Sequence, residues 1–162
     1  MHDDSIASKF IVFKIAEYHL ALPISIVLKV LNCAAAGSEF TTMGILQLGR
    51  HTIRVVDLHE RLHSGSSGEK LRHSPFLVIT RAPGGELCGI PVEEPPNLVE
   101  LPLETIQTLP KADRYSKPAL NLVSHVAVLS QEKVTTTIFL LDLQQVLNPT
   151  LSDAYPLALK SS

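Results

Sequence analysis

The sequence predicts an all-β protein with a few short helices, built from two similar halves. Of its 162 residues 45% are hydrophobic but only 5% are aromatic, and Leu, Val and Ile in short runs supply most of the apolar content, which favours strands. An internal near-repeat gives the two halves the same opening and the same ending. A chain of this length can also bury a core without disulfides or a structural metal.

Each half opens with a predicted β-hairpin. In the first half, residues 10–13 form a short apolar run, the chain turns near Glu17, and it returns through residues 20–22. The corresponding parts of the second half are residues 76–79, the Pro-Gly-Gly turn 83–85 and residues 87–90. Apolar runs separated by turn residues are typical of hairpins. We therefore expect an antiparallel strand pair at the start of each half.

A short helix is predicted later in each half. Residues 24–31 follow Pro23, and residues 103–107 follow Pro102. Proline is tolerated at an early helical position because the amide hydrogens there have no partner within the helix. The two prolines therefore predict where these helices begin.

The two halves share an ending. The first closes with residues 55–62 (VVDLHERL) and the second with residues 140–147 (LLDLQQVL). Two aliphatic residues finish a strand, and the Asp that follows, Asp57 or Asp142, can accept backbone N–H bonds as the N-cap of a short helix. A Glu or Gln three positions later completes the pattern of a capping box. We expect each Asp to act as a cap.

The charge pattern argues against several classes of partner. The net charge is −2, and the 14 basic and 16 acidic side chains are intermingled, so neither nucleic acid nor an anionic membrane surface is expected to bind. The first residues are acidic where a signal peptide is basic, and the apolar run 138–141 is too short to span a bilayer. We expect a soluble, cytoplasmic protein without direct membrane insertion.

No cofactor motif is present. The Gly/Ser stretch 63–70 has neither the GxxxxGK[ST] spacing of a phosphate loop nor the G-x-S-x-G of a nucleophile elbow, so it is expected to be a linker or an exposed loop. Cys33 and Cys88 stand far apart without a CxxC motif, and both are expected to be small core hydrophobes. The sequence thus predicts no cofactor.

One motif points to a different class of protein. His59, Glu60 and His63 match H-E-x-x-H, in which two His bind zinc and the Glu acts as a general base. The near-repeat argues against this interpretation, because the equivalent positions carry Gln144, Gln145 and Asn148. The extended motif with a third His is also missing. A zinc hydrolase using His59, Glu60 and His63 is kept as an alternative, and no metal site is expected.

Four stretches carry a family resemblance. They are residues 20–24 (LALPI), 55–58 (VVDL), 89–94 (GIPVEE) and 99–106 (VELPLETI). In their order and spacing they resemble the CheW-like domain of bacterial and archaeal chemotaxis systems, from about Lys9 to Leu147. The resemblance implies two five-stranded, SH3-like β-barrels packed on each other.

The implied organisation is a single domain over residues 8–150. Its expected parts are a first barrel half over about 8–63, a linker over 64–73, a second barrel half over about 74–149, and a C-terminal tail over 151–162.

The resemblance also implies an adaptor without catalysis. Its partners would be the regulatory domain of a CheA-type histidine kinase, itself a CheW-like fold, and the cytoplasmic tip of a chemoreceptor. In the family an Asn-Leu-Arg-Gly hairpin, whose Arg is tied to this coupling, precedes the closing strand of the first half. Here the residues are Gln47-Leu48-Gly49-Arg50, so Arg and Gly have traded places.

This hairpin supplies the candidate partner-binding residues, which are Gln47, Leu48, Arg50, Ile53 and Arg54. Leu48 and Ile53 would be apolar anchors, while Arg50 and Arg54 would provide orientation and specificity. Arg50 could also be no more than a solvated turn residue. Because of the exchanged Arg, a divergent CheW-like module of non-flagellar motility or another two-component pathway is the alternative function.

Overall fold

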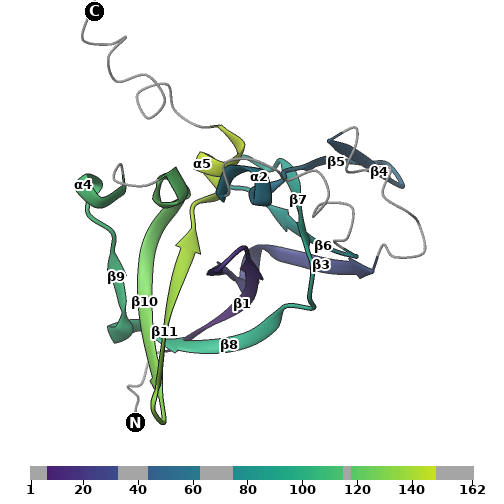
Figure 1. Cartoon of the computed structure of the whole chain (residues 1–162). Coiled ribbons are helices and arrows are strands. Elements are labelled where there is room, and N and C mark those ends of the chain that lie inside the picture. The colour runs from purple at the N-terminus through teal and green to yellow at the C-terminus, as the bar shows by residue number, and fades with distance from the viewer. Residues whose placement is uncertain (1–6, 33–43, 63–74, 115–117, 149–162) are drawn as a thin grey trace, which may run out of the picture.

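A computed structural model describes residues 7–32, 44–62, 75–114 and 118–148, which form two β-sheets packed against each other (Figure 1). The larger sheet has six strands in the order β8-β1-β2-β11-β10-β9. Its neighbouring strands are antiparallel except β2 and β11, which are parallel. The strands are β1 (Ala7–Ile15), β2 (Tyr18–Pro23), β8 (Asn97–Pro102), β9 (Ile106–Thr108), β10 (Val123–Gln131) and β11 (Val134–Leu141).

The smaller sheet has five strands in the order β3-β6-β7-β5-β4. Again one pair, β5 with β7, is parallel and the others are antiparallel. The strands are β3 (Val27–Asn32), β4 (Ile45–Leu48), β5 (His51–Val55), β6 (Phe76–Arg81) and β7 (Leu87–Val92). The prediction of an all-β fold is confirmed, although one sheet has a sixth strand, β9.

Both predicted hairpins are present, and each lies in the sheet of the other half. The β1–β2 hairpin is flanked by β8 and β11 of the second half, and the β6–β7 hairpin by β3 and β5 of the first. Each hairpin thus pairs in parallel with the closing strand of the other half. The sheets cut across the expected division at residues 64–73, and that linker and the tail 151–162 lie outside the described residues.

The prediction of helices over residues 24–31 and 103–107 was wrong. Each proline is followed by a single 3-10 turn, Ile24–Ile26 (η1) or Leu103–Thr105 (η2), and then by a strand. In β3 the register places Leu31 opposite Leu77, and Leu31 packs against the core cluster that contains Leu77. Pairing and packing with a distant strand outweigh the local helix propensity of this segment.

The shared endings form short helices, α2 (Leu58–Leu62) and α5 (Leu143–Leu147), and two further short elements are α4 (Lys111–Arg114) and η3 (Pro118–Leu122). The Asp142 carboxylate accepts hydrogen bonds from the backbone N–H groups of Gln144 at 3.1 Å and Gln145 at 3.4 Å, which confirms its role as an N-cap. The same role for Asp57 stays a prediction.

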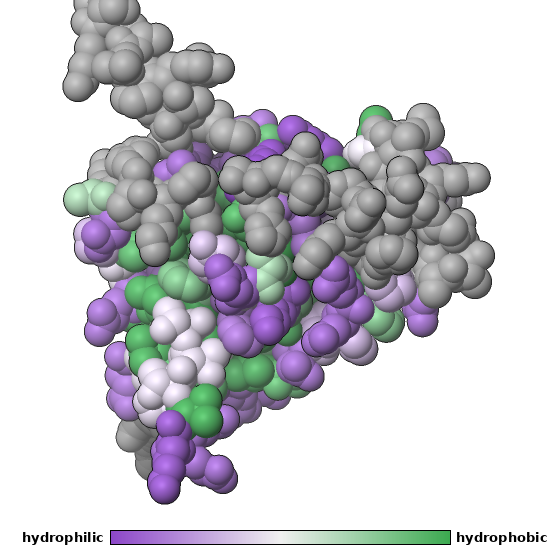
Figure 2. Space-filling model, viewed as in Figure 1, coloured by the Kyte–Doolittle hydropathy of each residue, from purple (hydrophilic) through white to green (hydrophobic). Residues whose placement is uncertain are grey.

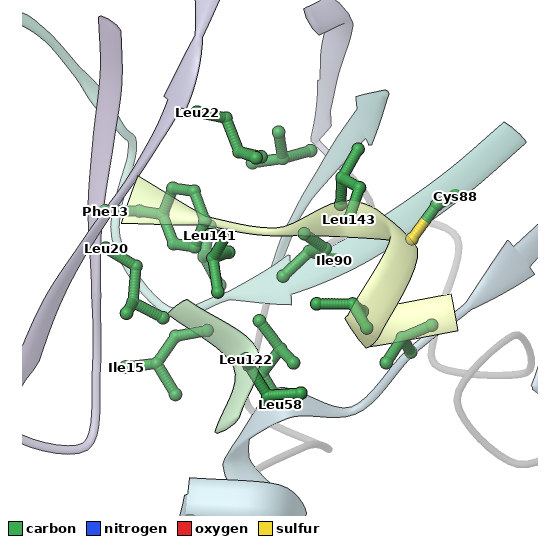
Figure 3. Close-up of a cluster of buried hydrophobic side chains, with 14 of the residues drawn as sticks. Phe13, Ile15, Leu20, Leu22, Leu58, Cys88, Ile90, Leu122, Leu141 and Leu143 are labelled. Atoms are coloured by element: carbon green, nitrogen blue, oxygen red, sulfur yellow. The ribbon is translucent and has the colours of Figure 1, made fainter. Parts of the chain in front are cut away.

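The main core lies between the sheets, where side chains from β1, β2, β7, β11 and α5 converge (Figure 3). It includes Cys88, which is fully buried, so the expectation that this residue is a core hydrophobe is confirmed. Burial raises the pKa of the Cys88 thiol to about 12. Cys33 lies outside the described residues. Each sheet also has a smaller core of its own.

None of the helices in the described segments is long and apolar enough to cross a lipid bilayer.

Candidate functional site

The β4–β5 hairpin holds the candidate residues predicted from the sequence. Its turn is Gly49-Arg50, and Gly49 has a φ of +63°, a conformation that favours glycine. The Gln47 side-chain amide donates to the Gly49 carbonyl at 3.4 Å and accepts from the Thr52 hydroxyl at 3.0 Å. These bonds brace the turn and leave Arg50 exposed at its end.

Arg54 extends from β5 toward the opposite half of the chain. Its guanidinium donates to the Glu86 carboxylate with Nη1 3.4 Å from Oε2, and both side chains are 44% exposed. Arg54 and Arg50 are therefore in different environments, one in an ion pair within the protein and the other at an exposed turn.

Leu48 and Ile53 face inward and line a cavity of about 240 Å³ at the smaller sheet. Ile53 is almost fully buried in that sheet's own core, and Leu48 packs against the same cluster. The other lining residues come from four strands, and they are Leu28, Lys29, His51, Ile79, Arg81 and Leu87. The structure thus brings two of the predicted anchors together with β3 and β6.

A second cavity of about 480 Å³ adjoins the first, and Leu28 and Arg81 line both. It lies between the sheets and is lined mainly by apolar side chains, together with Ser25, Ser124 and Asp142. We call the two cavities together the β3–β6 groove, which is defined by Pro23, Ser25, Ile26, Leu28, Lys29, Leu48, His51, Ile53, Ile79, Arg81, Ala82, Pro83, Leu87, Ser124, Leu141, Asp142 and Leu143.

Exposed apolar side chains belong to the segment that lines this groove. Leu28 lines both cavities and is 46% exposed, and Ile24 and Val30, next in the chain to the lining residues Ser25 and Lys29, are 41% and 39% exposed. Large aliphatic side chains gathered next to a hollow are typical of a protein interface. The face drawn in Figure 2 shows hydrophobic areas separated by hydrophilic ones, and the tip of the β10–β11 hairpin at its lower end is hydrophilic.

Sequence reasoning missed Leu28, Lys29 and Arg81 as site residues. Residues 24–31 were expected to form a helix. A helix and a strand expose different side chains of the same segment, so this expectation gave the wrong set of exposed residues. Arg81 ends β6 opposite Leu87, and only the pairing of β3 with β6 brings it beside Leu28. A run of aliphatic residues broken by a single Lys was the one signal available.

His59 of the H-E-x-x-H motif is buried, with 1% of its side chain exposed. Its Nδ1 lies 3.7 Å from Asp57 Oδ1 and its Nε2 lies 3.9 Å from Glu93 Oε2. His63 and the side chain of Glu60 lie outside the description. Within the described segments no three metal-ligating side chains lie close enough to hold an ion.

Comparison with known protein families identifies one family. The CheW-like domain family matches residues 9–150 of the chain. Among solved structures, the scaffolding protein TtCheW from Thermoanaerobacter tengcongensis matches with a TM-score of 0.67 and 20% sequence identity, over 90% of this chain and 91% of that chain. At this identity the similarity shows the fold, which has two SH3-like subdomains. No curated protein sequence matches the chain significantly.

Proposed function

Because this chain belongs to the CheW-like domain family, whose members are scaffolds of chemotaxis-type signalling, we propose that it couples a CheA-type histidine kinase to the cytoplasmic tip of a chemoreceptor without catalysing a reaction. An adaptor of this kind needs two binding surfaces. The observation that carries the proposal is that the described residues offer two adjoining ones, the β3–β6 groove, part of which is lined by the β4–β5 hairpin, and the exposed edge and turn of the same hairpin.

We assign the groove to the receptor. A receptor tip that presents a helix can place one apolar face in a groove, with anchors spaced along that face. The aliphatic lining, with Leu28 shared by the two cavities and the exposed Ile24 and Val30 on the same segment, supports this assignment. Leu48 and Ile53 form part of the groove floor, so their predicted role as apolar anchors is kept in this form.

We assign the β4–β5 hairpin to the kinase. β4 is at one end of its sheet, and in the described part of the chain only β5 pairs with it. Ile45 is 52% exposed on this strand, and Gln47 and Arg50 are exposed beside it. An edge strand with unpaired backbone groups can bind the edge of another β domain, and an exposed Arg next to it adds orientation.

The proposed partners place the protein in the cytoplasm, where a kinase and the cytoplasmic tip of a receptor would both be found. The zinc-hydrolase alternative is set aside in this proposal, because a catalytic zinc needs an open coordination position and His59 of α2 is buried.

The exchanged turn supports a second candidate, a divergent module in non-flagellar motility or another two-component pathway. Gly49 occupies the position with a φ of +63°, which a β-carbon disfavours, so Arg50 stands one place later in the hairpin than the family's Arg. The side chains of successive residues point in different directions. A partner that binds the family's Arg at its usual position would therefore meet a different surface on this protein.

Binding of the full chain to the histidine kinases and receptor-tip fragments of its source cell tests the proposal. We expect Leu28→Asp to lose the receptor tip and keep the kinase, and Arg50→Glu to weaken kinase binding. Val134→Asp is the matched control for Leu28, because Val134 is 65% exposed and lies outside both surfaces. If the chain binds neither partner, or if all three variants bind like the unmodified chain, the assignment is wrong. Capture of a pilus-type receptor instead would favour the second candidate.

A further inference from the structure

We propose that the β3–β6 groove selectively binds a helix whose apolar face is bordered by carboxylates, and that Arg81 is the residue that recognises the negative charge of these carboxylates. The inference rests on the proposed function, since it specifies the partner of the same groove. It is carried by the charges that line the groove.

Arg81 occupies the centre of this groove. It lines both cavities, and its side chain is exposed at the end of β6. Across the described ranges no ion pair involves Arg81, and the same holds for Lys29, the other cation of the groove. Within the described residues, two positive charges therefore stand next to an apolar floor without an ion pair to a carboxylate.

The acidic residue of the groove offsets only one of these two charges. Asp142 lines the larger cavity, where its Oδ1 accepts the backbone N–H groups of Gln144 and Gln145 and is held at the start of α5. The nearby Arg54 has its own partner in Glu86. Among its Lys, Arg, Asp and Glu side chains, the groove thus has two cations and one carboxylate, an excess of one positive charge.

The positive charge of the groove distinguishes between partners whose apolar faces are the same. A carboxylate next to Arg81 can form a bidentate hydrogen-bonded ion pair with its guanidinium. The surrounding apolar surface excludes water and so strengthens this ion pair. A basic segment would bring like charges together at the same place and would lose affinity. The position of Arg81 between two cavities predicts an acidic side chain between two apolar anchors on one helix face, at spacings of three or four residues.

Designed helical peptides test the inference directly. Three peptides of about 18 residues share Leu anchors at the spacing of one helix face and carry Glu, Gln or Lys between them. Their dissociation constants are measured by fluorescence anisotropy against the full chain and against Arg81→Glu, Arg81→Gln and Lys29→Glu. Lys133→Glu, at the exposed β10–β11 turn, is the control for net charge.

We expect the Glu peptide to bind about tenfold more tightly than the Lys peptide, with the Gln peptide between them, and added salt to reduce the difference. Arg81→Glu should reverse the order, Arg81→Gln should abolish it, and Lys133→Glu should preserve it. Equal binding of the Glu and Lys peptides, or an order unchanged in Arg81→Gln, would overturn the inference.

These experiments distinguish a failure of the charge selection from a failure of the proposed function. If all three peptides bind equally and Leu28→Asp abolishes their binding, the groove is a docking site and only the charge selection is wrong. If the chain binds no kinase or receptor tip but the peptides show the expected order, the charge selection stands and the coupling role is wrong. A thermal unfolding curve for each variant shows whether it is folded, so that a change in binding is not mistaken for a loss of fold.

Discussion

Arg54 Nη1 lies 3.4 Å from Glu86 Oε2, and this ion pair joins β5 of the first half to the β6–β7 turn of the second. It crosses the place where the two halves exchange hairpins, next to the parallel pairing of Arg54 with Cys88. Arg54 was predicted from the sequence to bind a partner protein, and this role stays a prediction. Within the chain its guanidinium is paired with Glu86.

Glu86→Gln should change the free energy of unfolding by less than about 1 kcal/mol, because exposed ion pairs are screened by water and salt. Both side chains are 44% exposed. Urea unfolding at low and high salt measures the change, with Glu17→Gln in the exposed β1–β2 turn as the control. A loss of several kcal/mol would mean that the pair holds the exchanged hairpins together.

Asp142→Ala should lower the free energy of unfolding by about 1 kcal/mol, because two backbone N–H groups of α5 lose their acceptor. Asp142→Asn keeps a side-chain oxygen and should recover most of the loss. Denaturant unfolding compares the two variants. Equal stability of both with the unmodified chain would show that this cap contributes little.

Gly49→Ala should destabilise the protein by about 1 kcal/mol or more, because the β-carbon is strained at a positive φ. Gly49 has a φ of +63°, and a β-carbon there meets no atom within 4 Å, so the cost comes from the backbone alone. Gly84→Ala is the matched control, since it is equally uncrowded but lies outside the positive-φ region. Differential scanning calorimetry should show a lower Tm for Gly49→Ala only.

Cys88 should resist alkylation while the protein is folded, because burial raises the pKa of its thiol from 9.0 to about 12 and keeps it protonated. Mass spectrometry after iodoacetamide treatment at pH 8, in a Cys33→Ser background, should find Cys88 unmodified until denaturant is added. Rapid alkylation of the folded protein would contradict this.

The same shift predicts a pH dependence. Because the folded-state pKa lies above the unfolded one, the folded protein retains the thiol proton to higher pH. The contribution of Cys88 to stability should be complete below about pH 9 and decline as the pH rises toward about 12. Cys88→Ala should remove this part of the alkaline decline in urea unfolding curves.

Zinc analysis of untagged protein should find far less than one zinc ion per chain. His59 is buried, and its ring nitrogens face Asp57 and Glu93 on different sides. Stoichiometric zinc that disappears in His59→Ala would instead support the hydrolase alternative.

Only part of the groove could be found from the sequence. Leu48 and Ile53 were predicted as apolar anchors because they belong to the hairpin that resembles the family's, and both line the groove. Leu28 and Arg81 meet there because β3 pairs with β6, and no local pattern specifies which distant strand a segment will join.

The sequence by itself determined the local features of this protein. The β1–β2 and β6–β7 hairpins and the Asp142 cap involve residues close along the chain, so turn residues and spacing were enough to predict them.

Only the tertiary structure decided the exchange of hairpins between the halves, the strand after η1 in place of a helix, and the position of Arg81 between two cavities. Each of these depends on pairing and burial between segments far apart in the chain. Their free energy exceeds the small local preferences that a sequence reveals, and for that reason the surface proposed to recognise a partner became visible only in the folded molecule.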